Sequence, residues 1–236
     1  MDVGEIILDA IRYPSSDWKK IIILGVILII PIVDFIGLGY VLRIIKSTIS
    51  GVDDLPEFND LGNLFVDGLK VLVVSIVYLI IPFIVLGLGV FGSLATFSGL
   101  VNITVVIGLI LAILFGLFDI IALANMAFYD ELGAAFKFRE IFERISEIGW
   151  GKYILWFIIM IIIWTIFGII AGILNVIPYI GLIIAIIIFY SYFYMFGGRS
   201  TGLIYSNNLE TRKTLNPPDK SVKETSVTDE SDKPAN

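Results

Sequence analysis

Residues 71–91 read VLVVSIVYLIIPFIVLGLGVF, and this stretch decides the fold class. It contains no charged residue, and as an α-helix it is long enough to cross a hydrocarbon core about 30 Å thick, which takes roughly 20 residues. Three further apolar runs follow: 100–128 with Asp119 inside it, 153–174 and 176–196. The sequence therefore predicts an all-α polytopic transmembrane protein with four full spans.

The composition agrees with this class, because 58% of the 236 residues are hydrophobic and 16% are charged. Soluble domains average about 45–50% and 25%. The chain contains no histidine and no cysteine, which excludes zinc hydrolysis and catalysis by Cys or Ser/His pairs. We therefore expect a protein that is not an enzyme and that holds no metal and no cofactor.

A further hydrophobic run, residues 21–45, is interrupted by Pro31 and Asp34. The acidic segment before it argues against a signal peptide, so we expect this run to be retained. It is either a complete span or a re-entrant hairpin that turns near Pro31. In the hairpin each arm of about 12 residues would reach only about 18 Å.

Basic residues place the loops relative to the membrane, because short cytoplasmic loops are enriched in Lys and Arg. The connection 129–152 contains Lys137, Arg139, Arg144 and Lys152, whereas 92–99 contains no Lys or Arg. We therefore expect a cell-membrane protein in which this connection and the C-terminal tail, 206–236, are cytoplasmic. The tail is polar and rich in Ser, Thr, Pro, Asp and Lys, which predicts disorder.

An internal repeat organises the membrane domain, 1–205. Residues 4–12 match 62–70 class for class, with the same glycine and aspartate and a final basic residue, and the polar spacing recurs at 137–147. This spacing gives one polar stripe along a helix. It predicts three interfacial amphipathic helices with their apolar faces towards the acyl chains. The repeat units lie near residues 2–46, 60–128 and 134–199.

Several motifs resemble the archaeal multi-pass membrane proteins grouped as domain of unknown function 4013. They are Asp9-Ala10-Ile11-Arg12-Tyr13-Pro14, Ser16-Asp17-Trp18-Lys19-Lys20, Leu55-Pro56-Glu57-Phe58, Leu64-Phe65-Val66-Asp67-Gly68-Leu69-Lys70 and Gly149-Trp150-Gly151-Lys152-Tyr153. The resemblance covers roughly residues 4–205. It implies a multi-pass architecture in an archaeal cell membrane and lends no activity.

The candidate functional residues are polar groups that a bilayer penalises, above all Asp34 and Asp119. A charge at mid-membrane costs at least about 2.5 to 3.5 kcal/mol, so each aspartate should face protein or water and have a partner. The other members of this candidate site are Asn102, Asn125, Arg43 and Arg199, the two arginines being candidate partners for the aspartates. Two hypotheses follow: a polar cavity coupled to a cation or proton, or buried hydrogen bonding between helices.

Two further sets of residues carry structural predictions. Small residues four apart indicate faces where helices approach closely, and internal packing is favoured there over homodimerisation. These residues are Gly108, Ala112, Gly116, Gly168 and Gly172. Aromatic and basic residues beside the apolar runs are typical of anchors at the headgroup level. These anchors are Trp18, Lys19, Lys20, Trp150, Lys152 and Tyr153.

We therefore expect a membrane-organising or partner-binding component, with a small-solute or ion/proton-coupled transporter that uses the buried aspartates as the alternative. The expected partners are the lipid bilayer and either another protein or a further copy of the chain, and no nucleic acid. The amphipathic helices favour the first role, and the aspartates favour the second.

Overall fold

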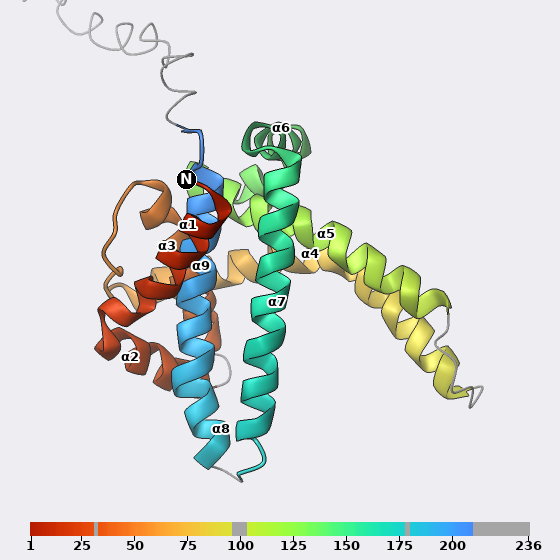
Figure 1. Cartoon of the computed structure of the whole chain (residues 1–236), viewed down its shortest axis with the longest axis horizontal. Helices are drawn as coiled ribbons and strands as arrows, with labels where there is room; N and C mark the ends of the chain where they lie inside the picture. The colour runs from red at the N-terminus through yellow and green to blue at the C-terminus, as the bar shows by residue number, and fades with distance from the viewer. Residues whose placement is uncertain (31–32, 96–102, 178–179, 210–236) are drawn as a thin grey trace, which may run out of the picture.

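The computed structural model describes residues 1–30, 33–95, 103–177 and 180–209, and every regular element within these ranges is a helix (Figure 1). The elements are α1 (Val3–Arg12), η1 (Tyr13–Ser16), α2 (Trp18–Ile29), α3 (Asp34–Ile49), α4 (Leu61–Ala95), α5 (Ile103–Tyr129), η2 (Leu132–Phe136), α6 (Phe138–Ile148), α7 (Trp150–Leu174), α8 (Ile180–Ile184), η3 (Ala185–Tyr190) and α9 (Ser191–Ser206). The segment η3 is a π-helical stretch that joins α8 to α9. The all-α prediction is confirmed.

Four helices are long and apolar enough to cross a membrane, as the sequence predicted. They run over Leu61–Gly92, Ile103–Tyr129, Trp150–Leu174 and Gly181–Ser206. The last begins later than expected and extends through α9. Many of their large apolar side chains are exposed, which suits helices whose solvent is lipid.

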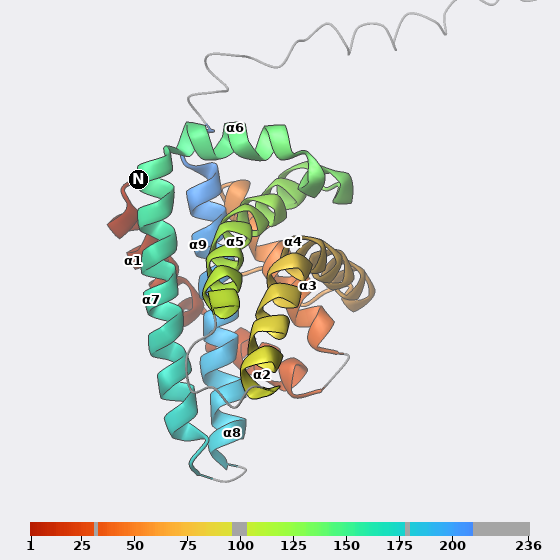
Figure 2. The same cartoon turned by 90° about the vertical axis from the view of Figure 1, so that its right-hand side faces the viewer.

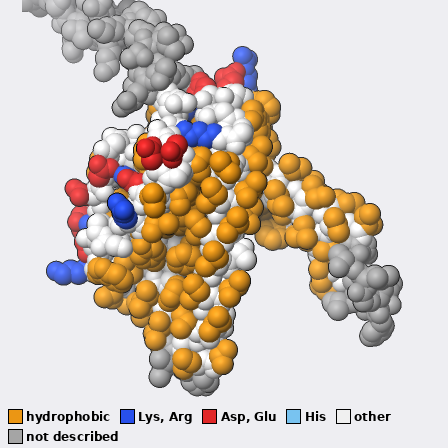
Figure 3. All heavy atoms as spheres, in the orientation of Figure 1, with side chains coloured by type: hydrophobic (Ala, Val, Ile, Leu, Met, Phe, Trp, Pro, Cys, Tyr) orange, Lys and Arg blue, Asp and Glu red, His pale blue; other side chains and the backbone are white. Residues whose placement is uncertain are grey.

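The spans form two antiparallel pairs that diverge. The pair α4–α5 leads away from the pair made by α7 and α8–α9, as Figures 1 and 2 show from two sides. The short helix α6 lies crosswise over the end of α7. Charged side chains gather on the upper and left-hand part of the face in Figure 3, while hydrophobic side chains cover the lower part and the α4–α5 pair. On this face the charged side chains lie towards the end of the protein that carries α6 and the N-terminus, which we call the polar end.

The first hydrophobic run is an antiparallel hairpin of two helices. The helix α2 has 12 residues, which at 1.5 Å per residue gives about 18 Å, too short for a span. Leu24 and Leu28 of α2 approach Gly37 near the start of α3. At the other end of α2, Lys20 Nζ donates to the Leu55 carbonyl oxygen at 2.7 Å. Of the two readings of the sequence, the geometry matches the hairpin.

Glycines let α3 cross α4 closely. A Cβ at Gly39 would overlap the Leu64 carbonyl oxygen, and a Cβ at Gly68 would overlap the Phe35 carbonyl oxygen. The missing side chains bring the two backbones into contact, as in membrane helix pairs generally. Neither glycine belonged to the set predicted from small residues four apart.

The expected interfacial helix near residues 60–70 is not a separate element. It is the first part of α4, which continues without a break into the span. The other two amphipathic segments are separate helices. Pro14 lies in the turn that follows α1, and Gly149, with φ +95°, separates α6 from α7. Gly68 lies inside α4 without interrupting it, and residues 69–81 contain neither glycine nor proline.

The apolar face of α1 is turned towards the protein. Ile6 and Ala10 are fully buried and Ile7 is 8% exposed, all within the main core cluster. The expectation that this face meets the acyl chains is therefore wrong, because the adjoining helices cover it. In α6, Ile141 and Ile145 are likewise buried.

Candidate functional site

Asp119 lies in the middle of the span α5 and is 8% exposed. The Ser75 hydroxyl of α4 donates to its two carboxylate oxygens at 3.2 and 3.4 Å. The buried carboxylate thus receives a hydrogen bond from the neighbouring helix, which lowers the cost of its burial. This contact joins the two helices of the α4–α5 pair.

Asp34, the other intramembrane aspartate of the prediction, begins α3 and is half-buried. A carboxylate in the first turn interacts favourably with the positive end of the helix dipole. Its place at the turn of the α2–α3 hairpin separates it from the Ser75–Asp119 contact between α4 and α5. The structure gives each aspartate its own local setting.

Arg199 of α9 is bound to acidic residues outside the spans. Its Nε donates to Asp9 Oδ1 and its Nη2 to Asp53 Oδ1, each at 2.7 Å, while Nη1 donates to the Val52 carbonyl oxygen at 3.1 Å. The guanidinium carbon lies 4.8 Å from the centre of the Tyr13 ring. Arg199, a candidate partner for the intramembrane aspartates, instead binds two carboxylates at the polar end.

The Tyr13 hydroxyl belongs to the same polar end and donates to the Asp54 carbonyl oxygen at 3.1 Å. Burial raises the pKa of Tyr13 to about 12, and the nearby Arg199 opposes this rise in pKa. The phenol is therefore neutral at physiological pH and acts as a donor. Sequence reasoning did not find this cluster, because its members come from three parts of the chain that are far apart: Asp9 to Tyr13, Val52 to Asp54, and Arg199.

Arg43 also differs from the prediction. Its Nη1 donates to Asn59 Oδ1 at 2.6 Å and to the carbonyl oxygens of Glu57 and Asn59. It fixes the connection between α3 and α4 along α3, and its pairing with Asp34 as a charge partner is not observed. The reach of a long arginine side chain lets it leave the apolar face for the polar loop.

Asn125 is 2% exposed near the end of α5. Its Nδ2 donates to the Ala134 carbonyl oxygen at 2.8 Å, and its Oδ1 accepts from the Tyr205 hydroxyl at 2.7 Å. Both bonds hold neighbouring segments together. Asn102, the remaining member of the predicted polar site, lies outside the described residues.

The predicted small-residue faces divide into two groups. A Cβ at Gly108 would crowd Leu86 of α4, and one at Gly116 would lie 3.8 Å from Phe157, so this face, which includes the half-buried Ala112, meets other helices. Gly168 and Gly172 face open space, with nothing within 4 Å of an added Cβ. The predicted close packing at these two is wrong: Gly168 borders a cavity between α7 and the η3–α9 segment, and no described atom lies within 4 Å of a Cβ at either position.

The predicted anchors also divide. Trp18 is 56% exposed and Lys19 is exposed, while Lys20 binds the connection after α3. Trp150 is half-buried, and Lys152 Nζ donates to the Met1 carbonyl oxygen at 2.5 Å. Tyr153 is not an anchor at the surface, because it is fully buried and its hydroxyl donates to the Leu117 carbonyl oxygen.

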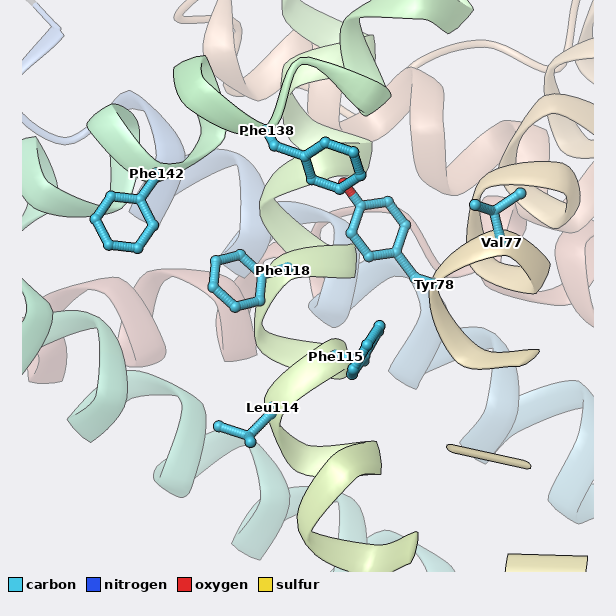
Figure 4. Close-up of a pocket in the computed structure, with 7 residues that line it drawn as sticks. All are labelled: Val77, Tyr78, Leu114, Phe115, Phe118, Phe138 and Phe142. Carbon is cyan, nitrogen blue, oxygen red and sulfur yellow. The ribbon is translucent and has the colours of Figure 1, made fainter. Parts of the chain in front are cut away.

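An aromatic groove lies between α4, α5 and α6, and we call it the α6 groove. Its volume is about 460 Å³, and its lining is Val77, Tyr78, Leu114, Phe115, Phe118, Phe138 and Phe142. Figure 4 shows Phe138 and Phe142 on α6 above the side chains of α5. Both are exposed, at 61% and 52%. The sequence analysis missed this groove, although aromatic pairs three and four residues apart were its visible signal.

Comparison with known proteins identifies the family. A profile described as "Protein of unknown function (DUF4013)" matches residues 22–176, which is more than half of the chain. The chain belongs to the DUF4013 family. The uncharacterised protein MJ1189 of Methanocaldococcus jannaschii is 29% identical over 124 residues, covering 50% of this chain and 44% of that protein. The chain thus spans less than half of this relative's length. No solved structure matches it.

The DUF4013 match contains some of the described features and omits others. It includes Asp34, Asp119 and all residues of the α6 groove. It begins after Asp9 and ends before Arg199. The groove therefore belongs to the DUF4013 region, whereas the ion pair that fastens α1 to α9 lies outside it.

Proposed function

We propose that the protein is a membrane-organising component that binds the hydrocarbon chain of a membrane lipid in the α6 groove. The observation that carries this proposal is the lining, in which five of the seven side chains are aromatic and none is charged. Burying apolar surface against such side chains is favourable by about 25 cal/mol per Å² when the alternative is water. Within a bilayer the surrounding lipid is equally apolar, so close packing against the groove has to favour binding of the chain there.

The size of the groove favours a single chain. A helix with its side chains is about 10–12 Å across, and a space of about 460 Å³ would hold only a fragment of one. A flexible hydrocarbon chain fits such a space along its length. A lipid is therefore a better occupant than a transmembrane helix of a partner protein.

Basic residues beside the groove support a lipid with an anionic headgroup. Lys137 and Arg139 flank Phe138 in the sequence, and both are exposed at the start of α6. Each has an acidic neighbour on α6, Glu140 at 3.4 Å and Glu143 at 2.9 Å. Exposed pairs of this kind contribute little energy, so a phosphodiester group can compete for these bases.

The proposal is tested by filling the groove. Leu114→Trp puts an indole into the space, and Leu88→Trp is a matched control because Leu88 is 65% exposed on α4 away from the groove. We expect lipid that co-purifies in mild detergent, quantified by mass spectrometry, to fall several-fold in Leu114→Trp only. Equal lipid retention by both variants and the wild type would refute the proposal.

A non-enzymatic role is part of this proposal. The charged groups of the predicted site take part in contacts between segments, as Arg43 and Arg199 do. In the described ranges no group of three or more Asp or Glu is arranged to hold a metal ion.

The proposal also includes an orientation in the membrane. We place the polar end, with α6 and the end of α9, in the cytoplasm, because of the Lys and Arg residues of 129–152.

Transport is the second candidate. One observation favours it: the Ser75 hydroxyl that binds Asp119 lines a cavity of about 480 Å³ along α4. The other residues of that cavity are apolar, which disfavours passage of an ion. The membrane-organising role therefore has the stronger support.

A further inference from the structure

A small polar pocket lies at the polar end of the protein, where α5, α6 and α9 meet. Its volume is about 370 Å³. The residues that matter for its chemistry are Asn125, Arg139, Glu140, Glu143, Arg144 and Tyr205. This pocket differs in kind from the α6 groove, which is lined by apolar and aromatic side chains, and we call it the α6–α9 pocket.

Arg144 is the centre of the α6–α9 pocket and is 3% exposed. Its Nη1 donates to Glu147 Oε2 at 2.7 Å, and its Nη2 donates to the carbonyl oxygens of Tyr205 and Asn207. The guanidinium carbon lies 5.0 Å from the centre of the Tyr205 ring. These contacts hold the cation rigidly at the wall of the pocket.

Two buried polar atoms at this pocket have no hydrogen-bond partner among the described residues. They are Arg144 Nε, a charged donor, and Glu140 Oε2, an acceptor. A buried donor or acceptor without a partner destabilises the protein, most of all when it is charged, unless a ligand or water completes its hydrogen bonding. The two residues are four apart on α6, so their side chains lie on the same face of the helix.

The charges of the lining define the ligand. Two arginines and two glutamates line the α6–α9 pocket, so its formal charge is balanced. A simple anion would meet Glu140 and Glu143, and a simple cation would meet Arg139 and Arg144. A molecule that carries an anionic oxygen acid and an ammonium group satisfies both the free donor and the free acceptor.

We propose that the α6–α9 pocket binds a small zwitterion of the phosphoethanolamine type. The phosphate accepts from Arg144 Nε, and the ammonium donates to Glu140 Oε2. This chemistry is shared by a soluble zwitterion and by a zwitterionic lipid headgroup at the membrane surface. Arg144 and Glu140, whose atoms carry this inference, are not part of the lining of the α6 groove, so the two proposals can be tested apart.

The first test is titration of the detergent-solubilised full-length protein with O-phosphoethanolamine, followed by calorimetry. We expect saturable binding that is at least about tenfold tighter than binding of inorganic phosphate or ethanolamine alone, a difference of about 1.4 kcal/mol. Absence of saturable binding in both this titration and the lipid experiment below overturns the proposal. So does equal affinity for the zwitterion and for either half of it.

The variants test the two named atoms. Glu140→Gln removes the charge of the acceptor and leaves Arg144, which binds several segments, in place. It should weaken binding of the zwitterion at least about tenfold. Arg144→Lys keeps a positive charge but loses Nε, and it should also weaken binding. Glu131→Gln is the control, because Glu131 is exposed and is not part of the pocket lining. If all three variants bind like the wild type, the assignment is wrong.

A second arm distinguishes the sources. The protein is placed in nanodiscs of phosphatidylglycerol with or without phosphatidylethanolamine, and O-phosphoethanolamine is then titrated. If phosphatidylethanolamine competes with O-phosphoethanolamine, and this competition is lost in Glu140→Gln, the pocket assignment is supported and the lipid headgroup is the ligand. Equal affinity in both nanodiscs supports the pocket and identifies the soluble molecule. Because Leu114→Trp leaves these side chains intact, failure of the lipid-chain proposal is scored separately.

Discussion

Arg199 Nε donates to Asp9 Oδ1 across 2.7 Å, although 190 residues separate the two in the chain. The bond joins the last helix to the first. Asp53, in the connection after α3, binds the same guanidinium. One arginine at the end of a span therefore fastens two segments of the polar end onto the transmembrane helices.

The two carboxylates that bind Arg199 should contribute unequally to stability. The Asp9 side chain is 38% exposed and that of Asp53 is 87% exposed. Asp9→Ala should lower the free energy of unfolding by about 1–3 kcal/mol, because it leaves a largely buried cation short of a partner. Asp53→Ala should cost less than about 1 kcal/mol, as exposed pairs do. Thermal unfolding in detergent measures both, and equal losses would contradict this ranking.

The crossing of α3 and α4 should not tolerate a methyl group. Gly68→Ala places a Cβ onto the Phe35 carbonyl oxygen of α3, and overpacking of this kind costs about 1–3 kcal/mol or more. Gly172→Ala is the control, because nothing lies within 4 Å of its Cβ. Alanine is about 1 kcal/mol better than glycine inside a helix, so this variant should be neutral or stabilised. Size-exclusion profiles after heating should show earlier aggregation of Gly68→Ala than of Gly172→Ala. Similar profiles for the two variants would contradict the close crossing of α3 and α4.

The helix α1 should depend on the protein core for its stability. Ile6 is fully buried, whereas Leu8 is 57% exposed. Ile6→Ala should therefore lower the free energy of unfolding by about 2–4 kcal/mol, and Leu8→Ala by no more than about 0.5 kcal/mol. Limited proteolysis near the N-terminus would report the release of α1 in the first variant. If Leu8→Ala released α1 and Ile6→Ala did not, the face of α1 that carries Leu8 would be the one that packs against the core.

Asp119 separates the two candidate functions. If the protein organises membrane lipid, Asp119→Asn should remain inserted and retain co-purifying lipid, because the amide oxygen still accepts from Ser75. Proteoliposomes should then show no proton or cation flux that depends on this residue. A flux in the wild type that disappears in Asp119→Asn, with folding unchanged, would favour the transport alternative.

Sequence reasoning predicted the spans well, because about 20 consecutive apolar residues are a strong local signal. It failed where partners are set by tertiary structure. Arg199 was expected to meet an aspartate within the membrane, yet its partners are Asp9 and Asp53 at the polar end. Local hydropathy cannot show which distant segment folds back onto a helix end.

The small-residue pattern shows the same limit. Gly168 and Gly172 have the spacing of a packing face, yet no described atom lies within 4 Å of a Cβ at either, whereas Gly39 and Gly68, outside that pattern, bring the backbones of α3 and α4 into contact. Spacing describes one helix alone, and packing needs two. The α6 groove was missed for a related reason, because Phe138 and Phe142 could be recognised as a pair but not placed over α5.

The hairpin of α2 and α3 determines where the N-terminus lies. The start of α2 is held at the connection after α3 by Lys20, which binds the Leu55 carbonyl oxygen and Glu57. If the chain turns back within the membrane, the segments before α2 and after α3 share one side. Backbone outside a helix at membrane depth is tolerated only where protein or water covers it.

Because the chain has no cysteine, single cysteines can be probed with an impermeant maleimide in intact cells. Ser16, Ser50 and Ser146 are exposed positions before α2, after α3 and in α6. We expect all three to be shielded until the membrane is permeabilised, because the hairpin and an even number of later crossings keep them on the cytoplasmic side. Labelling at all three in intact cells would keep the hairpin but invert the orientation. Labelling at Ser16 alone would require a complete crossing between residues 16 and 50, and the hairpin would then be wrong.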